Sequence, residues 1–367
     1  MLLCRVFLTF VSKYAKKEKI KVIFRDVLTA AVSVMFFLPR KDREKLKYFF
    51  TRKPKSALMR YGIPSEYKGH EKQLCRAMRQ ALFKYGLCYE EYMLYGLYSD
   101  GGKSAHNFVS EIGRYKYFER YNDVTEASLF RNKCALYRRF KDYYGRKCVC
   151  CEKSSDVDVF CNFVKTHESF ILKPSSESCG SGIKIYSSSD IENLKEMFFK
   201  WLKQGKFICE ELVLQSELFS RLNPTSLNTV RFVNNPTDRN VQAFTPFLRV
   251  GRYGKEVDNA GAGGIFASVD AKTGRVIGCG RDENGCFYKQ HPDSHIYFDG
   301  LMLPEWDKAV RLVERLEENI KSRLISWDLA YSENNGWIMI EANYAGQFVC
   351  QQTCLAEKIR KVSGKET

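Results

Sequence analysis

Two acidic residues, Asp328 and Glu341, lie inside apolar stretches near the end of the chain. Their neighbours are Trp, Ile and Met, and a carboxylate in such surroundings carries a desolvation cost unless something offsets its charge. The side-chain period of a strand places Asn343 on the same face as Glu341. Three oxygen-bearing side chains on one face suit a hard divalent ion such as Mg²⁺, with water and phosphate oxygens as further ligands. The alternative is an edge hairpin whose polar face is solvated.

The residues between these two stretches predict how the stretches pair. Segment 332–336 reads Ser-Glu-Asn-Asn-Gly, which is rich in turn formers and indicates a hairpin. A turn centred between Asn334 and Asn335 places Asp328 directly opposite Glu341. Two carboxylates that face each other across a ladder repel, which again favours a cation between them.

A lysine at the end of an apolar strand precedes a loop of small residues. Lys173 follows Phe-Ile-Leu at 170–172, and Ser-Ser-Glu-Ser-Cys-Gly-Ser-Gly occupies 175–182. Backbone N–H groups in such a loop can bind phosphate oxygens, and the lysine supplies a point charge. The lysine precedes the glycines, so this is not a Walker A loop. The alternative is an ordinary hairpin turn with an exposed lysine.

Composition limits the class of protein and the kind of partner. The chain has 367 residues, of which 44% are hydrophobic, as expected for a globular protein with two or three subdomains rather than a disordered chain. The net charge is +16, from 59 Lys and Arg against 43 Asp and Glu, and the excess is densest in the first 150 residues. Such a charge favours nucleic acid, anionic lipid, or phosphorylated metabolites and carriers.

The cysteines and the N-terminus indicate a location. The chain has 14 scattered cysteines, and the one cluster, at 148–151, has no second Cys or His pair at zinc-site spacing. Without a clear secretory signal, reduced thiols in a cytoplasmic protein are expected. The apolar runs 1–11 and 27–38, separated by the basic segment 13–25, are shorter than the roughly 20 residues that cross a bilayer. They predict helices that either lie peripherally on the anionic inner face of a membrane or pack on the protein itself.

The predicted elements change in character near residue 125. Residues 1–125 are mainly helical and rich in aromatic residues, and short apolar runs then alternate with amphipathic helices, which indicates an α+β or α/β body. Strands are expected at 170–172, 183–186, 207–209, 230–233, 241–250, 264–269 and 276–288, and helices at 189–202 and 304–319.

The order of these features resembles the ATP-grasp superfamily over about residues 130–347. It looks most like the sugar-transfer-associated branch, which is found with cell-surface polysaccharide synthesis genes and is sometimes labelled α-L-glutamate-ligase-like. Three phrases carry the match: Leu-Asn-Pro-Thr-Ser-Leu-Asn-Thr-Val-Arg at 222–231, Asp-Asn-Ala-Gly-Ala-Gly-Gly at 258–264, and Ser-Trp-Asp-Leu-Ala at 326–330. Their joint occurrence in this order is the specific signal.

The resemblance implies an α+β ATP-grasp fold, in which two α+β lobes sandwich ATP, preceded by a mainly helical region. The implied divisions are a helical, basic N-terminal region at 1–125, a lobe with the Lys/Gly-rich loop and the adenine hinge at 126–215, and a C-terminal lobe with the Mg²⁺ site at 216–367. The resemblance covers the first region only loosely.

The resemblance also implies residue roles, by position in the family's motifs. The implied ATP-binding residues are Lys133 and Lys173 for the phosphates, Glu210, Glu211 and Val213 for adenine, and Glu217 for ribose. Lys173 and Arg231 are the implied catalytic residues, and Asp328, Glu341 and Asn343 the implied Mg²⁺ ligands. The alternatives are a solvated helical lysine at 133, surface acids at 210, 211 and 217, and a structural salt bridge at 231.

The implied activity is that of an ATP- and Mg²⁺-dependent ligase. A carboxylate becomes an acyl phosphate, and an amine or similar nucleophile then displaces the phosphate. The expected substrate is a small-molecule or carrier-linked sugar or amino acid in cell-surface polysaccharide biosynthesis or modification, with no specific nucleic acid. One alternative is an ATP-grasp phosphotransferase that acts on a sugar or carrier. Another is a basic module that binds membrane or nucleic acid without catalysis.

Overall fold

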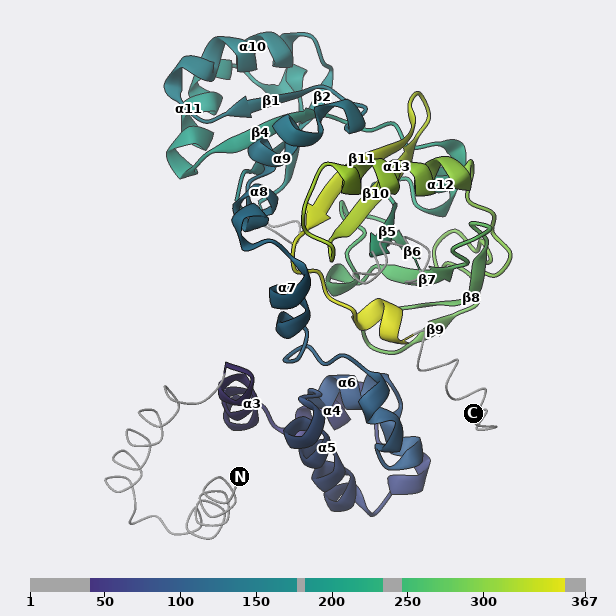
Figure 1. Ribbon diagram of the computed structural model, residues 1–367. Helices are drawn as coiled ribbons and strands as arrows, with labels where there is room; N and C mark the ends of the chain where they lie inside the picture. The colour runs from purple at the N-terminus through teal and green to yellow at the C-terminus, as the bar shows by residue number, and fades with distance from the viewer. Residues whose placement is uncertain (1–39, 177–181, 234–245, 354–367) are drawn as a thin grey trace, which may run out of the picture.

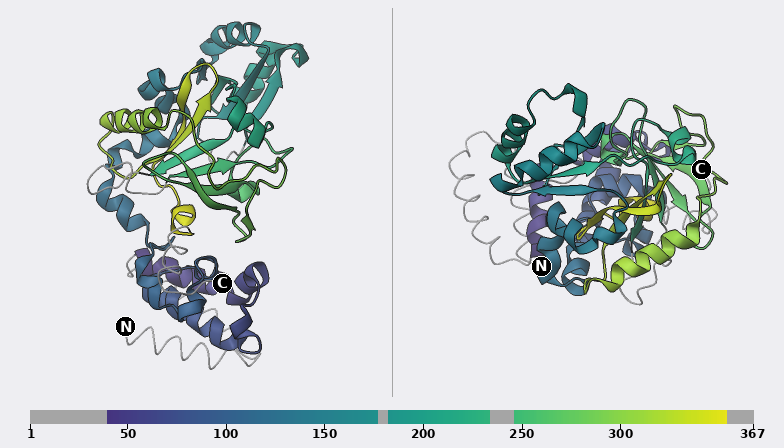
Figure 2. Two further views of the ribbon diagram at one scale, coloured as in Figure 1. Left: turned by 90° about the vertical axis from the view of Figure 1, so that its right-hand side faces the viewer. Right: turned by 90° about the horizontal axis from the view of Figure 1, so that it is seen from above.

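A computed structural model describes residues 40–176, 182–233 and 246–353. The predictions for 1–38, for most of the small-residue loop and for the first half of the strand expected at 241–250 lie outside these residues. The described chain forms a helical region, a small lobe around a four-stranded sheet and a larger lobe around a seven-stranded sheet (Figure 1). Figure 2 shows that the helical region lies at the end of the molecule opposite the small lobe.

The elements follow one another in this order. The helical region contains α3 (Arg40–Thr51), α4 (Pro54–Tyr61), α5 (Glu71–Tyr85), α6 (Tyr89–Leu94), α7 (Tyr115–Tyr121) and α8 (Ala127–Arg131). The small lobe contains α9 (Lys133–Phe140), β1 (Cys148–Cys151), α10 (Val157–Lys165), β2 (Ser169–Pro174), β3 (Lys184–Ser187), α11 (Leu194–Gln204) and β4 (Phe207–Glu211). The larger lobe contains α12 (Glu217–Leu222), β5 (Thr229–Val233), β6 (Phe247–Val250), β7 (Ile265–Val269), β8 (Val276–Arg281), β9 (Phe287–Tyr288), α13 (Trp306–Glu318), β10 (Ser326–Ser332) and β11 (Gly336–Asn343).

The helical region has its own apolar core. In α5 the residues Leu74, Met78, Ala81 and Leu82 are buried, and their spacing of three to four places them on one face of the helix. The helix ends at Gly86, whose φ of 80° is a left-handed conformation that favours glycine. The mainly helical character predicted for this part of the chain is confirmed from residue 40 onward.

The small lobe is an antiparallel sheet in the order β1-β4-β2-β3. Phe160 of α10 and Phe198 of α11 pack against Phe170 and Phe207 of the sheet. The cysteine cluster is strand β1, which pairs with β4 at the sheet edge, and sequence reasoning missed this strand. Among the described residues, no group of three or more His, Cys, Asp or Glu side chains has metal-binding geometry.

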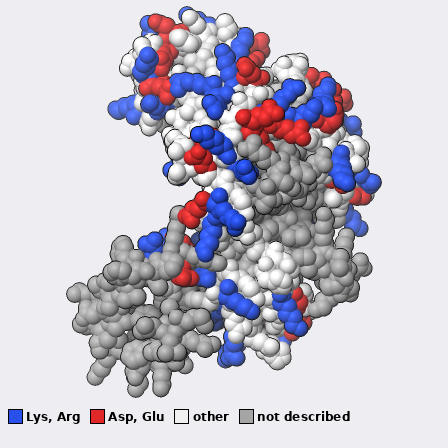
Figure 3. All heavy atoms as spheres, viewed as in Figure 1, with Lys and Arg blue, Asp and Glu red and all other residues white. Residues whose placement is uncertain are grey.

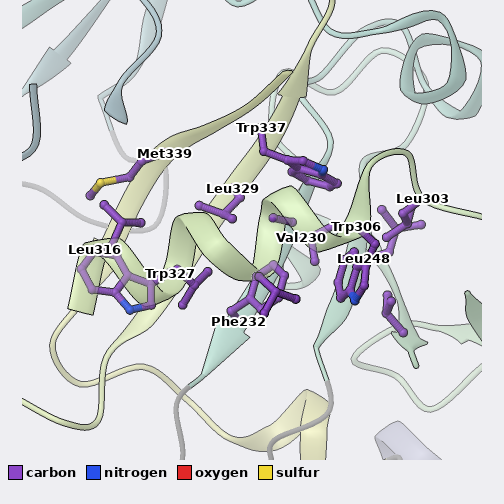
Figure 4. Packing of buried hydrophobic residues seen from close by; sticks show 14 of the residues in the cluster. Val230, Phe232, Leu248, Leu303, Trp306, Leu316, Trp327, Leu329, Trp337 and Met339 are labelled. Atoms are coloured by element: carbon purple, nitrogen blue, oxygen red, sulfur yellow. The ribbon is translucent and has the colours of Figure 1, made fainter. Parts of the chain in front are cut away.

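The larger lobe is an antiparallel sheet in the order β11-β10-β5-β6-β7-β8-β9. Helix α13 packs on one face through Trp306, Val313 and Leu316, against Phe232 of β5 and Trp327 of β10 (Figure 4). Because side chains alternate along a strand, burial of Trp327 against this core directs the neighbouring acid to the opposite face. Both sheets are antiparallel, so the α+β class is confirmed and an α/β body, which needs parallel strands, is excluded.

The β10–β11 hairpin contains one confirmed prediction and one error. Asp328 pairs with Glu341, as predicted. The turn is not centred as predicted, because Ser332 pairs with Gly336 around a three-residue loop. The register shifts between Asp328 and Leu329 of β10, which leaves Ile340 as an extra residue of β11. This β-bulge compensates for the turn and restores the predicted pair.

Two other elements differ from the prediction. The strand expected at 276–288 is divided into β8 and β9 by a turn, in which the Asp282 carboxylate accepts hydrogen bonds from the N–H groups of Asn284 and Cys286. The helix expected at 189–202 begins later, at Leu194, because the Asn193 side chain caps it. No helix in the described ranges has the length and apolar character needed to span a bilayer.

Candidate nucleotide and metal site

A cleft between the two lobes contains most of the predicted site residues. From the small lobe it is lined by Lys133, Lys173 and Glu210, and from the larger lobe by Asp328 and Glu341. An adjoining part of the cleft is lined by residues 211–215, which comprise the last residue of β4 and the four residues after it. The fold therefore brings together residues that are more than 200 positions apart in the sequence.

The two lysines reach the cleft from different elements. Lys133 is the first residue of α9, whose N-terminus is capped by the side chain of Asn132. The Lys133 N–H donates to the Ser175 carbonyl at 2.9 Å, and the Ser175 hydroxyl donates to the Asn132 side chain at 2.9 Å. These bonds hold the start of the small-residue loop beside α9. Lys173, on β2, lies next to β4 in the sheet.

The Glu210 side chain is buried between two cations. Its Oε2 accepts a hydrogen bond from Lys173 Nζ at 2.9 Å and one from Arg146 Nε at 2.8 Å. Burial alone would raise the pKa of Glu210, but the charges of Arg146 and Lys173 outweigh burial and lower the pKa to about 2. Since the side chain is engaged in these contacts, only the backbone of Glu210 remains for the predicted role at adenine.

The backbone of segment 211–215 lines the cleft and is fixed by hydrogen bonds to both lobes. The Glu211 carboxylate accepts a hydrogen bond from the Lys147 N–H at 3.1 Å. The carbonyl of Leu214 accepts a hydrogen bond from the Glu333 N–H at 2.9 Å, which attaches the segment to the β10–β11 hairpin. Val213 lines the cleft, and its N–H donates to no group among the described residues. A planar base with a ring acceptor could take this hydrogen bond.

Glu217 and Glu256 differ in their positions relative to the cleft. Glu217 is the exposed first residue of α12 and lies outside the lining of both parts of the cleft. Glu256 is exposed and lines both parts. Sequence reasoning missed Glu256, because an acid in a Gly-Lys-Glu-Val-Asp turn has the composition of an ordinary surface loop.

Asp328 is buried among arginines. Arg231 Nε and Nη2 donate to its two oxygens at 2.6 Å each, and Arg249 Nη1 donates at 3.0 Å. Burial opposes ionisation of Asp328, but the two arginines outweigh it and hold the pKa of this carboxyl below its ordinary value. The bidentate contact follows from the register, since Arg231 of β5 is the direct partner of Asp328 across the sheet.

Glu341 and Asn343 continue the same face of β11. Burial, together with the charge of Asp328 opposite, raises the pKa of Glu341 above its ordinary value. Within the described ranges, no group donates a hydrogen bond to the Glu341 carboxylate. Asn343 pairs with Ser326, and it lies two residues beyond Glu341, outside the residues that line the cleft.

The chemistry of these side chains fits a divalent cation beside phosphate. Glu341 is a half-buried carboxylate without a described partner, and a cation would relieve its repulsion with Asp328. Asp328 already shares its charge with two arginines. Glu341 would therefore supply most of the negative charge for Mg²⁺, with Asp328 and Asn343 as further oxygen donors.

Arg249 is a further charged residue of the site that sequence reasoning did not identify. Its guanidinium donates to Asp258 Oδ1 at 2.8 Å, to Asn259 Oδ1 and to Asp328. Burial raises the pKa of Asp258 despite this contact. Arg249 thus joins the loop at 258–264 to the acidic strand. The signal in the sequence was a charged residue within the apolar strand Phe-Leu-Arg-Val.

The low pKa of Glu210 predicts a specific pH dependence of stability. The folded-state pKa of about 2 lies below the ordinary value of 4.5, so the ionised contacts contribute stability above about pH 4.5 and lose it as pH falls toward 2. Glu210→Gln is expected to remove up to about 3 kcal/mol at neutral pH. The difference in unfolding free energy between wild type and variant, measured in urea, should shrink below about pH 4.5. A difference that is constant down to pH 3 would contradict the assignment.

The chain is similar to one sequence family and to several solved structures. A sequence model of the family described as sugar-transfer associated ATP-grasp matches residues 113–363. The solved N5-carboxyaminoimidazole synthetase from Staphylococcus aureus, complexed with ADP, is 11% identical over 65% of this chain and 52% of its own, with a TM-score of 0.38. This chain therefore spans about half the length of that synthetase.

Two further solved structures are similar to the chain. The ATP-grasp ligase PsnB, complexed with minimal precursor, is 10% identical over 72% of this chain and 70% of its own, with a TM-score of 0.39. D-alanyl-alanine synthetase A from Vibrio cholerae is 12% identical over 65% and 66%, with a TM-score of 0.38. A comparison with curated proteins finds no match. The family match covers more than half of the sequence, and the chain belongs to the sugar-transfer associated ATP-grasp family.

Proposed function

We propose that the protein is an ATP- and Mg²⁺-dependent ligase that joins a carboxylate to an amine or similar nucleophile. The observation that carries the proposal is the meeting, in one cleft, of two lysines from the small lobe with Asp328 and Glu341 of the larger lobe. Arg231 pairs with Asp328 across the sheet but is not among the residues that line the cleft. Cations on one wall, and on the other an acid that accepts no hydrogen bond from the described residues, suit a magnesium nucleotide. A basic module without catalysis would have no use for these acids.

In the proposed reaction, a carboxylate oxygen of the substrate attacks the γ-phosphorus of ATP, and ADP leaves. The amine nitrogen of a second substrate then attacks the acyl carbon, phosphate leaves and the nitrogen loses a proton. Lys133 and Lys173 bind the phosphate oxygens, and Arg231 stabilises the charge on the transferring group. Bound Mg²⁺ would neutralise phosphate charge beside Glu341. No nucleophile from the protein is required, so its part is to position the reactants and stabilise charge.

The test is a search for substrates by nucleotide turnover. Purified protein is incubated with Mg²⁺ and ATP against amino acids, uronic acids and nucleotide sugars, and ADP, AMP and phosphate are measured. The proposal expects ADP and free phosphate only when a carboxylate and an amine are both present. AMP as product would indicate adenylation instead. A stable phosphorylated product that needs no carboxylate would support the alternative, a phosphotransferase that acts on a sugar or carrier.

The family description names sugar transfer. On this basis we propose a substrate of cell-surface polysaccharide biosynthesis or modification, either a small molecule or a carrier-linked sugar or amino acid. Such substrates are anionic or phosphorylated, which agrees with the net charge of +16. The proposed location is the cytoplasm, where ATP is available. All of the cysteines in the described part of the chain are free thiols, in keeping with this location.

Glu256 and Glu217 are the two candidate acids for binding the ribose of ATP, and a pair of substitutions distinguishes them. Glu256 lines the cleft next to the 211–215 segment, whereas Glu217 lies outside it. Glu256→Ala is expected to weaken ATP binding about tenfold, because two ribose hydroxyls lose a charged acceptor. Glu217→Ala serves as the matched control in calorimetric titration with Mg·ATP. A larger effect of Glu217→Ala would restore the role that its position in the sequence implies.

A surface of the helical region supports peripheral contact with an anionic membrane. On α3 and α4, Phe50 is 49% exposed and Met59 88% exposed. Residues 47–60 include five Lys or Arg and no acid. Figure 3 shows that basic side chains predominate on this region, whereas acidic side chains gather near α13. Apolar side chains among cations suit the interface of a bilayer that contains anionic lipid.

Vesicle binding tests this contact. Lys53→Glu with Lys55→Glu is expected to weaken sedimentation with phosphatidylglycerol vesicles by at least about tenfold, since each cation near the surface contributes about 1 kcal/mol. Lys200→Glu with Lys203→Glu, on exposed positions of α11, is the matched control. Equal loss in both double variants would indicate a general charge effect rather than this surface.

A further inference from the structure

Arg146 lies where the two lobes meet, and its side chain is 3% exposed. It precedes β1 of the small lobe, and its guanidinium donates to the Met339 carbonyl of the larger lobe at 2.8 Å and to the Ile340 carbonyl at 3.4 Å. Ile340 is the bulged residue directly before Glu341. The same guanidinium lies 4.6 Å from the ring centroid of Tyr144. Arg146 therefore joins the adenine-side lobe to the acidic strand.

The charges around Arg146 explain what this arrangement does for phosphate binding. Glu210 Oε2 contacts Lys173 at 2.9 Å and Arg146 at 2.7 Å, so one buried carboxylate is shared by two cations. With Arg146 present the cluster has a net charge of +1, and the charge of Lys173 remains available to an anion. Without Arg146, Lys173 and Glu210 would form a neutral buried pair. A lysine whose charge is neutralised by a carboxylate attracts phosphate more weakly than a lysine with excess positive charge beside it.

We propose that Arg146 is a positioning residue for the nucleotide, which neutralises Glu210 so that Lys173 keeps its charge for the phosphates. This inference rests on the proposed function, since it takes Lys173 as a phosphate-binding group. Arg146 lies outside the three segments at 222–231, 258–264 and 326–330 that carry the resemblance. Glu210 orients Lys173, and Arg146 prevents Glu210 from neutralising the charge of Lys173.

Calorimetric titration with Mg·ATP, on the full chain, tests the inference. Arg146→Met is expected to weaken ATP binding about tenfold. Adding Glu210→Gln to this variant should return the affinity to within about threefold of wild type, because the acid that holds Lys173 is gone. Arg146→Lys keeps the charge and should also stay within about threefold. Arg138→Met is the control, since Arg138 is 56% exposed and pairs with Glu152 away from the cleft.

The outcomes separate an electrostatic role from a structural one. If Arg146 only supports the fold, the double variant will bind ATP no better than Arg146→Met, and this result overturns the inference. An unchanged affinity in Arg146→Met overturns it too. Should Arg146→Met fail to fold, Glu210→Gln alone decides, because the inference expects tighter ATP binding and a structural role expects weaker binding. If wild-type protein binds no Mg·ATP, the proposed function itself is contradicted. If wild type binds Mg·ATP and the substitutions at Arg146 and Glu210 leave the affinity unchanged, only the role of Arg146 is contradicted.

Discussion

Glu341→Gln is expected to lower Mg²⁺-dependent ATP turnover by at least about 100-fold. Asp328 shares its charge with Arg231 and Arg249, so Glu341 is the acid of this pair whose charge no described cation neutralises by direct contact. The amide has the same shape, so the change removes the charge and leaves the packing. The measurement is the Mg²⁺ dependence of ATP turnover, in which the half-saturating Mg²⁺ concentration should rise.

The control for Glu341 lies on the same hairpin. Glu333 is an exposed acid in the loop between β10 and β11, and Glu333→Gln should leave the Mg²⁺ dependence unchanged. The thermal stability of Glu341→Gln should not fall, because the raised pKa of Glu341 indicates that its charged form is disfavoured in the folded protein. If Glu341→Gln has the same Mg²⁺ dependence of ATP turnover as wild type, Glu341 is not a ligand of the metal.

Arg231→Met is expected to lower turnover about 100-fold or more and to reduce the unfolding free energy by about 3 kcal/mol. Two effects combine here. The transferring phosphoryl group loses a planar cation, and the buried Asp328 loses its bidentate partner, keeping only Arg249. Arg231→Lys separates the two effects, because it retains charge beside Asp328 but cannot form the two parallel hydrogen bonds.

A second arginine in the same lobe provides the comparison for Arg231. Arg252 forms a similar fork with Asp293, at 2.8 and 2.9 Å, but its side chain is 35% exposed. Arg252→Met is expected to cost at most about 1 kcal/mol and to leave turnover unchanged. Urea unfolding and turnover are measured on both variants. Equal stability losses in Arg231→Met and Arg252→Met would show that burial of the Asp328 pair contributes little.

Local pattern predicted the acidic hairpin well. Alternation along two strands and a turn-rich segment between them predicted that Asp328 lies opposite Glu341, and the structure has this pair because the bulge compensates for the different turn. The position of the turn and the bulge at Ile340 were beyond such reasoning, because alternation fixes which face a residue occupies but not where an extra residue enters the ladder. The bulge brings two carbonyls of β11 to Arg146, a contact between segments that are distant in the sequence.

Residue type was a poor indicator of function at two places in the chain. The cluster at 148–151 is rich in cysteine, but it forms an edge strand in which only Cys151 is fully buried. Conversely, Arg249 is a single charged residue in an apolar strand, and only the structure shows that it contacts both Asp258 and Asp328 in the site. In both cases residue type alone was a weaker guide than the neighbours across the sheet.

The sequence by itself determined the helical N-terminal character, the acidic face of the hairpin and the order of motifs, because these depend on periodicity and on residues close together in the chain. The pattern of elements left an α+β and an α/β body open, and the antiparallel pairing of both sheets decided for α+β. Only the tertiary structure decided which charges meet: Arg231 and Arg249 on Asp328, Arg146 and Lys173 on Glu210, and Glu256 rather than Glu217 at the cleft. The ion pairs among these contacts join residues that lie up to 97 positions apart in the sequence. Their energies depend on burial and distance, which no local pattern encodes.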